Sequence, residues 1–272
     1  MPLDKRSLPP LKVVWSDEAL LIRIDVDATE LRSGVEPNLK LLGDPCTVLG
    51  QLAQATRRLG APPHRDWLAE ARRRLAAFRQ KWVEDPAPPA PPMTGRHIVD
   101  AIRPFLTEDL VFLMDGGNIG QWAHMALCDR YPAQWLTCGA SAVVGWGLPG
   151  AIGARLAYPR NPVLLLSGDG AIGFTLAELE TSVKHSAPFV IVLADDRAWG
   201  IVVSAQSHEH GAEGVLASRM AEVRYDQVAE AFGAIGVRVE RPEDLGPAIA
   251  KGLQANRTTL IHVPIAVGGP AD

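Results

Sequence analysis

The sequence predicts an α/β fold: a parallel sheet with helices on both faces. Two observations lead to this prediction. Apolar segments of strand length alternate with helical segments through the last two thirds of the chain, a pattern typical of strands that are buried on both faces. Glycine-containing polar turns follow two of these segments, at the strand ends where ligands bind in such sheets.

The composition indicates a soluble globular protein and argues against several classes of partner. The chain has 272 residues, of which 47% are hydrophobic and 21% charged, with a formal net charge of −4. This acidic balance gives no reason to expect binding to nucleic acid or anionic lipid. No apolar run reaches the ~18 residues of a membrane span and no secretory leader is recognisable, so we expect a cytoplasmic protein. The cysteines Cys46, Cys128 and Cys138 are widely spaced and are expected to be reduced thiols.

A proline-rich segment divides the chain into two regions. Residues 85–93 contain the run Asp85-Pro-Ala-Pro-Pro-Ala-Pro-Pro92, which excludes helix and central strand and predicts a stiff, extended linker. Residues 94–272 hold most of the alternating elements and are expected to form the main domain. Residues 1–84 hold too few elements for a complete α/β domain: a strand pattern and two helical patterns, at 20–27, 41–52 and 66–82.

The elements expected after the linker follow one another along the chain. The strands are short apolar runs at 111–114, 163–167, 189–194, 237–240 and 260–265. The helices are expected at 147–158, 176–185, 225–232 and 243–255. Thr175 and Glu178 have the spacing of a capping box, so we expect the second of these helices to begin at this threonine. Between the strand at 189–194 and the helix at 225–232 we expect a long loop.

Two of these strand ends have residues that indicate a ligand site. One strand continues into Gly168-Asp-Gly-Ala-Ile-Gly173 and the next into Asp195-Asp-Arg-Ala-Trp-Gly200. The first hexapeptide matches the G-x-G-x-x-G of dinucleotide sites, and an acidic pair follows 22 and 23 residues after Gly173, so an NAD-dependent oxidoreductase is one interpretation. Against it, Asp169 places a carboxylate where a pyrophosphate approaches, and like charges repel unless a cation lies between them.

A divalent cation removes this conflict. Mg²⁺ prefers oxygen ligands, commonly one or two carboxylates completed by phosphate oxygens and water. Asp169 and Asp196 can supply two carboxylates from neighbouring strand ends, while Gly168 and Gly170 allow backbone N–H groups to approach a diphosphate. The sequence therefore predicts a metal and diphosphate site, with a simple tight turn at residues 168–173 as the alternative.

These motifs resemble those of the thiamine diphosphate (ThDP)-dependent enzymes of the acetolactate synthase, 2-oxo acid decarboxylase and 2-hydroxyacyl-CoA lyase superfamily. That superfamily has Gly-Asp-Gly followed about two dozen residues later by Asn-Asn or Asn-Asp; here Asp196 lies 27 residues after Asp169, and Asp195 replaces the usual first Asn. The resemblance implies that Asp169, Asp196 and the carbonyl of Ala198 hold Mg²⁺ on the cofactor's diphosphate. It places further cofactor contacts at Gly117, Asn118, Gly168, Gly170, Ala171 and Ile172.

A second stretch extends the resemblance over residues 94–266, which correspond to the diphosphate-binding (PP) domain. The run Gly145-Trp-Gly-Leu-Pro-Gly-Ala-Ile-Gly-Ala154 is similar to the superfamily's G-x-G-L-P-A-A-I-G-A helix. Val144 occupies the position where relatives place Met or Ile under the bent cofactor. The resemblance further implies that the carbonyl of Ala142 and the amide of Val144 hold the aminopyrimidine ring.

The region before the linker resembles the end of the superfamily's central domain, through Ile22-Arg-Ile-Asp-Val-Asp-Ala-Thr-Glu30 and Gly43-Asp44. The chain then corresponds to a relative without the pyrimidine-binding domain, whose glutamate protonates the aminopyrimidine. Glu18, Glu30 and Glu36 are expected at the surface, so we expect no catalytic residue in this chain. The glutamate is expected from a partner subunit with the pyrimidine-binding domain, in a hetero-oligomer such as a dimer of heterodimers.

The resemblance implies cleavage or formation of a carbon–carbon bond in a 2-oxo acid or a 2-hydroxyacyl compound, with ThDP as the electron sink. Two alternatives stay open: a non-catalytic ThDP-binding or structural module of a complex, and the NAD-dependent oxidoreductase. His208 and His210, in the segment after the second motif, are candidates for substrate contact, and a solvated loop is the other interpretation of them.

Overall fold

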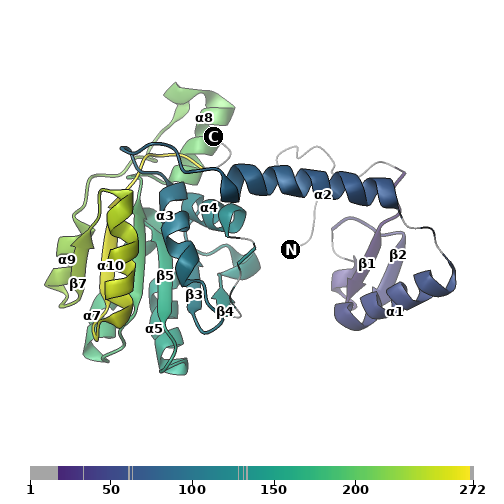
Figure 1. The fold of residues 1–272 in the computed structure, drawn as a ribbon, viewed down its shortest axis with the longest axis horizontal. Helices are drawn as coiled ribbons and strands as arrows, with labels where there is room; N and C mark the ends of the chain where they lie inside the picture. Colours follow the sequence, from purple (N-terminus) through teal and green to yellow (C-terminus); the bar gives the residue numbers. More distant parts are fainter. Residues whose placement is uncertain are drawn as a thin grey trace. The chain divides into compact units, whose positions relative to one another are not determined.

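The structure is a computed structural model that describes residues 18–269 except residues 33, 61, 63, 128, 131 and 133. Cys128 therefore lies outside the described residues. The chain divides into two compact units, Met1–Arg72 and Arg73–Asp272, and the first of them contains β1, β2 and α1 of Figure 1. None of the helices in the described residues is long and apolar enough to cross a membrane.

The first unit is small and leaves most of its large apolar side chains exposed. Its parallel strands β1 (Ile22–Asp25) and β2 (Leu39–Leu42) are followed by α1 (Pro45–Arg58), and η1 (Glu30–Arg32) lies between the strands. The side chain of Asp44 caps α1 by accepting a hydrogen bond from the N–H of Thr47 at 2.8 Å. Leu31 is buried, whereas Leu20 and Leu59 are 79% and 84% exposed, so apolar burial contributes little to this unit.

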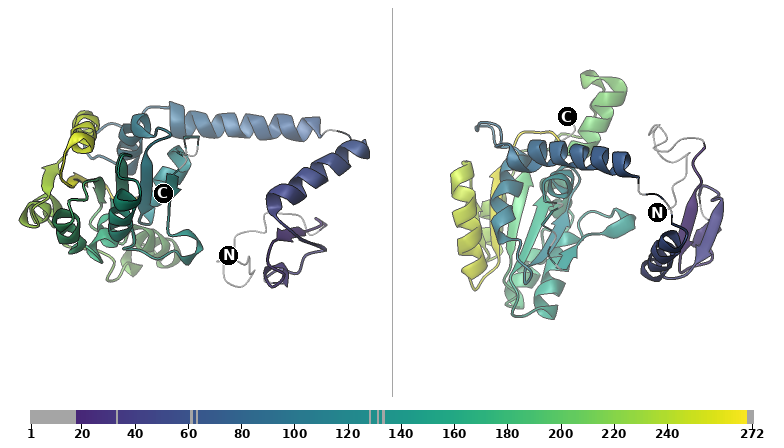
Figure 2. Two further views of the ribbon diagram at one scale, coloured as in Figure 1. Left: turned by 90° about the horizontal axis from the view of Figure 1, so that it is seen from below. Right: turned by 45° about the vertical axis from the view of Figure 1, so that its right-hand side comes forward.

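The second unit is built on a parallel sheet, as the sequence predicts (Figures 1 and 2). In the described residues the sheet has six strands in the order β4-β3-β5-β6-β8-β7. The strands are β3 (Val111–Asp115), β4 (Gln134–Leu136), β5 (Val163–Gly168), β6 (Val190–Asp195), β7 (Ile235–Arg238) and β8 (Thr259–Pro264).

Helices cover both faces of this sheet, and alternate strand residues face the two layers. Leu164 and Leu166 pack with one set of helices, and Val163 and Leu165 with the other. The first set is α3 (Gly95–Ile102), α4 (Asn118–Ala126) and α10 (Pro242–Gln254). The second set is α5 (Gly147–Ala157), α7 (Glu178–Lys184) and α9 (Tyr225–Ala231). The remaining elements are α2 (Arg65–Arg79), η2 (Gln80–Glu84), η3 (Arg103–Phe105), η4 (Gly139–Ser141), α6 (Asp169–Gly173), α8 (Gly200–His210) and η5 (Ala212–Gly214).

Two local predictions are wrong. The segment expected to be a long loop forms helix α8 instead. The predicted capping box is absent as well, because α7 begins at Glu178 with Ala177 at its N-cap. The hydroxyl of Thr175 donates to the carbonyl oxygen of Gly145 at 2.9 Å, so it is engaged in a contact between distant segments.

The proline-rich segment is fixed to helix α3 and does not behave as a free spacer. The guanidinium of Arg96, only 5% exposed, donates hydrogen bonds to the carbonyl oxygens of Lys81, Val83 and Asp85. The ring Nε2 of His97 lies 2.9 Å from the carbonyl oxygen of Pro88. Side chains of α3 therefore hold the polypeptide on both sides of residue 85.

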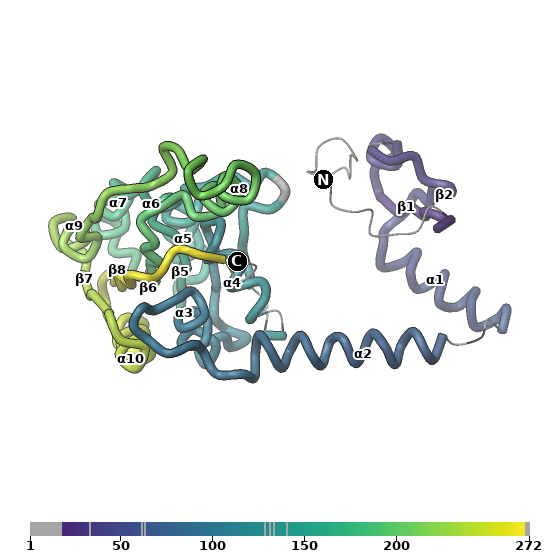
Figure 3. Tube along the Cα trace, turned by 90° about the horizontal axis from the view of Figure 1, so that it is seen from above, coloured from purple at the N-terminus to yellow at the C-terminus, as the bar shows by residue number. Residues whose placement is uncertain are grey.

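The order in which strands are added to the sheet reverses at β3. From β3 the chain passes through α4 to β4, on one side of β3. From β4 it passes through α5, on the opposite face of the sheet, to β5 on the other side of β3. In open α/β sheets, ligands bind outside the carboxyl ends of the strands at such a switch point. The segment after β8 runs from the sheet towards α4, as Figure 3 shows from above. The fold therefore places the ligand site at the ends of β3 and β5.

Candidate functional site

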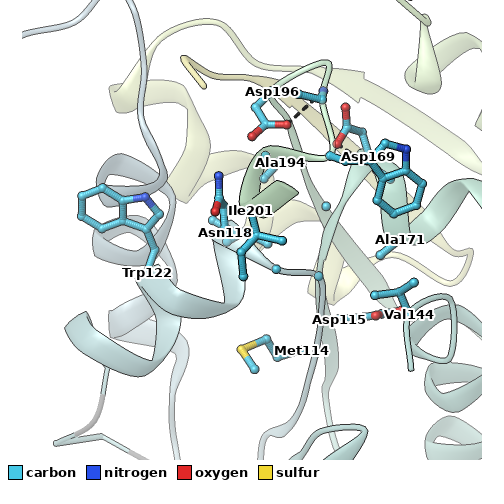
Figure 4. Close-up of a pocket in the computed structure, with 18 of the residues that line it drawn as sticks. Met114, Asp115, Asn118, Trp122, Val144, Asp169, Ala171, Ala194, Asp196 and Ile201 are labelled. Carbon is cyan, nitrogen blue, oxygen red and sulfur yellow. Dashed lines mark hydrogen bonds between the residues drawn. The ribbon is translucent and has the colours of Figure 1, made fainter. Parts of the chain in front are cut away.

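A pocket of about 300 Å³ lies at the carboxyl ends of β3, β5 and β6. Segments far apart in the sequence form it, namely residues 114–119, 142–144, 168–171 and 198–201. Figure 4 shows Asp169 and Asp196 at one end of the pocket and Val144 with Asp115 at the other. The pocket thus coincides with the switch point of the sheet.

The pocket brings together the residues that the sequence predicts, with one exception. The predicted residues that line it are Gly117, Asn118, Ala142, Val144, Gly168, Asp169, Gly170, Ala171, Asp196 and Ala198. Ile172 is 1% exposed and packs in the core under the sheet, so its side chain is not part of the lining. Sequence reasoning missed Asp115, Trp122 and Ile201, which also line the pocket.

Two buried carboxyl groups that line the pocket, Asp169 and Asp196, define its first end, which we call the carboxylate end, and the buried Asp195 lies next to Asp196 in the chain, outside the lining. Asp169 Oδ1 accepts a hydrogen bond from the N–H of Gly170 at 2.8 Å. Asp169 Oδ2 is buried and receives no hydrogen bond from the described residues. Asp196 Oδ1 accepts from the N–H of Ala198 at 3.2 Å. The carboxylate end thus has a free acceptor that faces neighbouring negative charge.

The pKa values of these groups indicate that the carboxylate end is short of positive charge. Burial and the neighbouring carboxyl groups of Asp195 and Asp196 raise the pKa of Asp169 to about 8. Burial, with the charge of Asp195, raises the pKa of Asp196 to about 6. Burial also disfavours ionisation of Asp195, but its contact with His262 outweighs burial and lowers the pKa of this group. A cation between Asp169 and Asp196 would relieve the repulsion and the desolvation of both.

Glycines let the backbone come close to this end. A Cβ atom at Gly200 would lie 2.3 Å from Asn118 Nδ2 and 2.4 Å from Asp196 Oδ2. At Gly117 it would lie 2.9 Å from the side chain of Ile201. Asn118 Nδ2 is itself buried without a hydrogen-bond partner among the described groups. The carboxylate end therefore offers an unused donor on Asn118 beside the unused acceptor on Asp169.

At the opposite end of the pocket, side chains hold the backbone of residues 142–147, which we call the Val144 turn. Asp115 Oδ2 accepts hydrogen bonds from the N–H groups of Gly145 and Gly147, at 3.0 and 2.8 Å. Thr175 donates to the carbonyl of Gly145, so both peptide groups of this glycine are fixed. Gly145 has φ +87°, and a Cβ there would lie 2.7 Å from the Cβ of Phe174. These contacts set the direction in which the backbone presents Val144 to the pocket.

Exposed apolar side chains surround the pocket. Val143, Phe174 and Ile201 are 52%, 64% and 44% exposed; Val143 and Ile201 line the pocket, and Phe174 packs on Trp199 with ring centroids 5.7 Å apart. We call these three residues the apolar rim. Exposed apolar side chains that gather in one place are typical of surfaces that another chain covers.

The two histidines proposed as substrate contacts do not belong to the pocket lining. His208 and His210 lie in the last turn of α8 and are exposed. In the described part of the chain, no group of three or more His, Cys, Asp or Glu side chains is arranged to hold a metal. A cation at the carboxylate end would therefore need backbone or ligand oxygens in addition to the two carboxylates.

Comparison with known families decides among the interpretations. A family model described as "Thiamine pyrophosphate enzyme, C-terminal TPP binding domain" matches residues 115–263. The matched residues include Asp169, Asp196 and the Val144 turn. The chain belongs to this family. Thiamine pyrophosphate is another name for ThDP, so the predicted superfamily is confirmed and the family supports ThDP, not NAD, as the ligand.

The known relatives are longer than this chain. It is 29% identical over 250 residues to the acetolactate synthase isozyme 1 large subunit of Escherichia coli (strain K12), which covers 91% of this chain and 43% of the relative. It is 26% identical over 268 residues to the glyoxylate carboligase of Escherichia coli O157:H7, or 93% and 44% of the two proteins. It is 31% identical over 172 residues to the sulfoacetaldehyde acetyltransferase of Castellaniella defragrans, or 62% and 29%. The chain therefore spans less than half the length of these relatives.

Proposed function

We propose that this chain binds ThDP together with Mg²⁺ and forms part of the active site of a carbon–carbon lyase or carboligase. The substrate class is a 2-oxo acid or a 2-hydroxyacyl compound. The observation that supports this proposal best is the carboxylate end of the pocket, where Asp169 Oδ2 is buried and unused at a strand end. A ThDP-family domain with this feature fits a cation held against a diphosphate.

The residues at the carboxylate end suit such a cation chemically. Asp169, Asp196 and the carbonyl of Ala198 would hold Mg²⁺, which commonly binds one or two carboxylates and completes its shell with phosphate oxygens and water. The unused amide of Asn118 and the backbone at Gly117 and the Gly168–Gly170 turn would bind the diphosphate. The raised pKa values of Asp169 and Asp196 support the same assignment, because both carboxyl groups gain from a bound cation.

The Val144 turn suits the other end of the cofactor. The carbonyl of Ala142 and the amide of Val144 would hold the aminopyrimidine, and the Val144 side chain would support the bent cofactor from below. Asp115 and Thr175 keep this turn in place through Gly145. Trp199 lines the same pocket and packs on Phe174. When bound, ThDP supplies a nucleophilic carbon and an electron sink for the carbon–carbon bond.

We further propose that a partner subunit covers the pocket and supplies the catalytic glutamate. The partner would carry the pyrimidine-binding domain, and the assembly would be a hetero-oligomer such as a dimer of heterodimers. The apolar rim supports this proposal, because Val143, Phe174 and Ile201 lie at or beside the pocket. The pocket lining among the described residues contains no glutamate. Glu18, Glu30 and Glu36 are exposed, as expected.

The assignment of regions follows the same proposal. Residues 1–84 would correspond to the end of a central domain, residues 85–93 to the linker and residues 94–272 to the PP domain. The proposed location is the cytoplasm.

Calorimetric titration of ThDP into the full chain, with and without Mg²⁺ and with and without the co-expressed partner, tests this function. We expect Mg²⁺-dependent binding, and turnover of a 2-oxo acid only in the complex. Normal turnover by the chain alone would contradict the partner-supplied glutamate. Absence of ThDP binding in both preparations would instead support the alternative, a structural module that has kept the fold without the cofactor.

A further inference from the structure

A row of ionisable side chains lies behind the carboxylate end, buried at Asp195, His262 and Asp226 and exposed at Arg224. His262, on β8, is 0% exposed and lies between two carboxyl groups. Its Nε2 lies 2.8 Å from Asp195 Oδ2, and its Nδ1 lies 3.2 Å from Asp226 Oδ1. Arg224 binds the same Asp226 with Nε and Nη2, at 2.9 and 2.5 Å. The row joins the end of β6 to β8 and to the start of α9.

The His262 ring bridges two carboxyl groups from distant parts of the chain, one at each ring nitrogen. The Tyr225 ring packs against it in a T-shaped arrangement, with centroids 5.5 Å apart, and water does not reach it. Buried carboxyl groups are tolerated where they are hydrogen-bonded, and this ring is a partner for both Asp195 and Asp226.

Asp195 connects this row to the pocket. While Oδ2 faces His262, Oδ1 accepts a hydrogen bond from the N–H of Arg197 at 3.1 Å. Arg197 has φ 52°, in the left-handed region, and its carbonyl accepts from the N–H of Met220 at 2.8 Å. The same short turn carries Asp196 and the carbonyl of Ala198. The orientation of Asp195 therefore determines where two of the proposed Mg²⁺ ligands lie.

We propose that His262 is a positioning residue for the carboxylate end: fixed between Asp226 and Asp195, its ring holds the Asp195 carboxyl group in the orientation that accepts the N–H of Arg197. The turn at residues 195–198 then keeps its shape before any cofactor binds. The value of this shape for Mg²⁺ and diphosphate rests on the proposed function, whereas the pairing of His262 with Asp195 does not.

A double-mutant cycle on the unliganded full chain tests the pairing. His262→Gln keeps a donor amide but loses the ring that bridges both carboxyl groups, and we expect its Tm to fall by about 10 °C, because a buried carboxylate loses its partner. Asp195→Asn removes the carboxylate that His262 contacts and keeps an acceptor for Arg197. The double variant Asp195→Asn/His262→Gln should recover at least half of the loss. The exposed His185, replaced by Gln, is the control and should leave Tm unchanged.

Two further readouts distinguish positioning from stability alone. In the unliganded chain, hydrogen exchange of residues 195–200 should be about tenfold faster in His262→Gln than in the His185→Gln control, while exchange in β3 stays the same. Mg²⁺-dependent ThDP binding should weaken about 10–100-fold, the range seen when outer residues that orient metal ligands are lost, because the turn that carries Asp196 and Ala198 loses its support.

Three results would overturn the proposal. The first is a double-mutant cycle in which the losses of the two single variants add. A double variant that stays unfolded when His262→Gln is unfolded counts as the same result, because either shows that His262 does not act through Asp195. The second is unchanged exchange at residues 195–200 in a folded His262→Gln chain. The third is unchanged Mg²⁺-dependent ThDP affinity in that chain. If the unsubstituted chain fails to bind ThDP, the proposed function fails, and the cycle and the exchange measurement still decide the role of His262.

Discussion

At the carboxylate end of the pocket, side chains face the ligand space with polar atoms unused, whereas at the Val144 turn they serve the backbone. Asp169 Oδ2 and Asn118 Nδ2 are buried without partners among the described groups. At the Val144 turn one oxygen of Asp115 is likewise buried without a partner among the described groups, but Asp115 and Thr175 each use another oxygen to hold the peptide groups around Gly145. The carboxylate end therefore has neighbouring carboxyl groups that a cation would satisfy, while the backbone of the Val144 turn is already held by side chains.

The two ends also differ in how much solvent reaches their surroundings. The carboxylate end lies deep at the ends of β5 and β6, where three carboxyl groups are buried. The Val144 turn lies beside the apolar rim, which is open to solvent in this chain. Because a charge needs a counter-charge and an apolar surface needs a cover, the two ends point to two different partners, a cation with its diphosphate and a second polypeptide.

The largest expected effect comes from removing the charge of Asp169. Asp169→Asn keeps the shape of the side chain, and we expect it to weaken Mg²⁺-dependent ThDP binding about 1,000-fold. This loss exceeds the roughly 10–100-fold that is typical when a residue that only orients a metal ligand is replaced. The unliganded variant should be at least as stable as the parent, since burial already disfavours the charged form. Calorimetry and thermal unfolding measure the two quantities. The exposed Asp66→Asn serves as the control, and a destabilised Asp169→Asn chain with intact binding would contradict the comparison.

The pH dependence of stability sharpens the same point. An unfolded chain releases the Asp169 proton near pH 4, whereas the folded, cation-free chain holds it until about pH 8. Between these values the folded state binds more protons, so its stability falls as pH rises, by at most about 1.4 kcal/mol per pH unit for this group. Thermal unfolding of the parent and Asp169→Asn from pH 5 to pH 8, without metal, should show a gap that widens with pH. Parallel curves would show that the Asp169 pKa is not raised.

The close backbone approach at the carboxylate end predicts a local steric effect. A methyl group at Gly200 meets Asn118 Nδ2 and Asp196 Oδ2, while one at Gly153, on the exposed side of α5, meets nothing within 4 Å. Gly200→Ala should therefore cost about 1–3 kcal/mol and weaken ThDP binding. Gly153→Ala should be neutral or stabilise the helix by up to about 1 kcal/mol. Chemical unfolding and calorimetry compare the two variants, and equal effects would show that Gly200 is not crowded.

Local sequence pattern predicted the framework of the site well. The apolar runs placed β5 and β6 within one residue of their observed bounds, Val163–Gly168 and Val190–Asp195, because buried parallel strands consist of continuous apolar residues. The same pattern failed for α8. Its second half, Ala205–His210, is mostly polar and gives the helix no clear apolar face, so the segment resembled a loop.

Contacts between distant segments could not be predicted in this way. Asp115 acts on N–H groups 30 and 32 residues further along the chain, and His262 acts on a carboxylate 67 residues earlier. In the sequence each is a single polar residue in or at the end of an apolar strand, with nothing nearby to indicate its partner. Ile172 differs from both: its place in the motif predicts a cofactor contact, and because its side chain packs in the core, such a contact would come from its backbone.

Thr175 allows the smallest effect to be tested, because two interpretations of it predict different variants. As a donor to the carbonyl of Gly145, it should tolerate Thr175→Ser, while Thr175→Val and Thr175→Asp should each lose about 1 kcal/mol. As a helix cap it would tolerate Thr175→Asp as well, since aspartate is a good N-cap residue. Urea unfolding of the three variants distinguishes the roles, and a fully stable Thr175→Asp chain would restore the capping interpretation. A loss in Thr175→Asp that is accompanied by weaker ThDP binding would show that the Val144 turn depends on a side chain from outside its own segment.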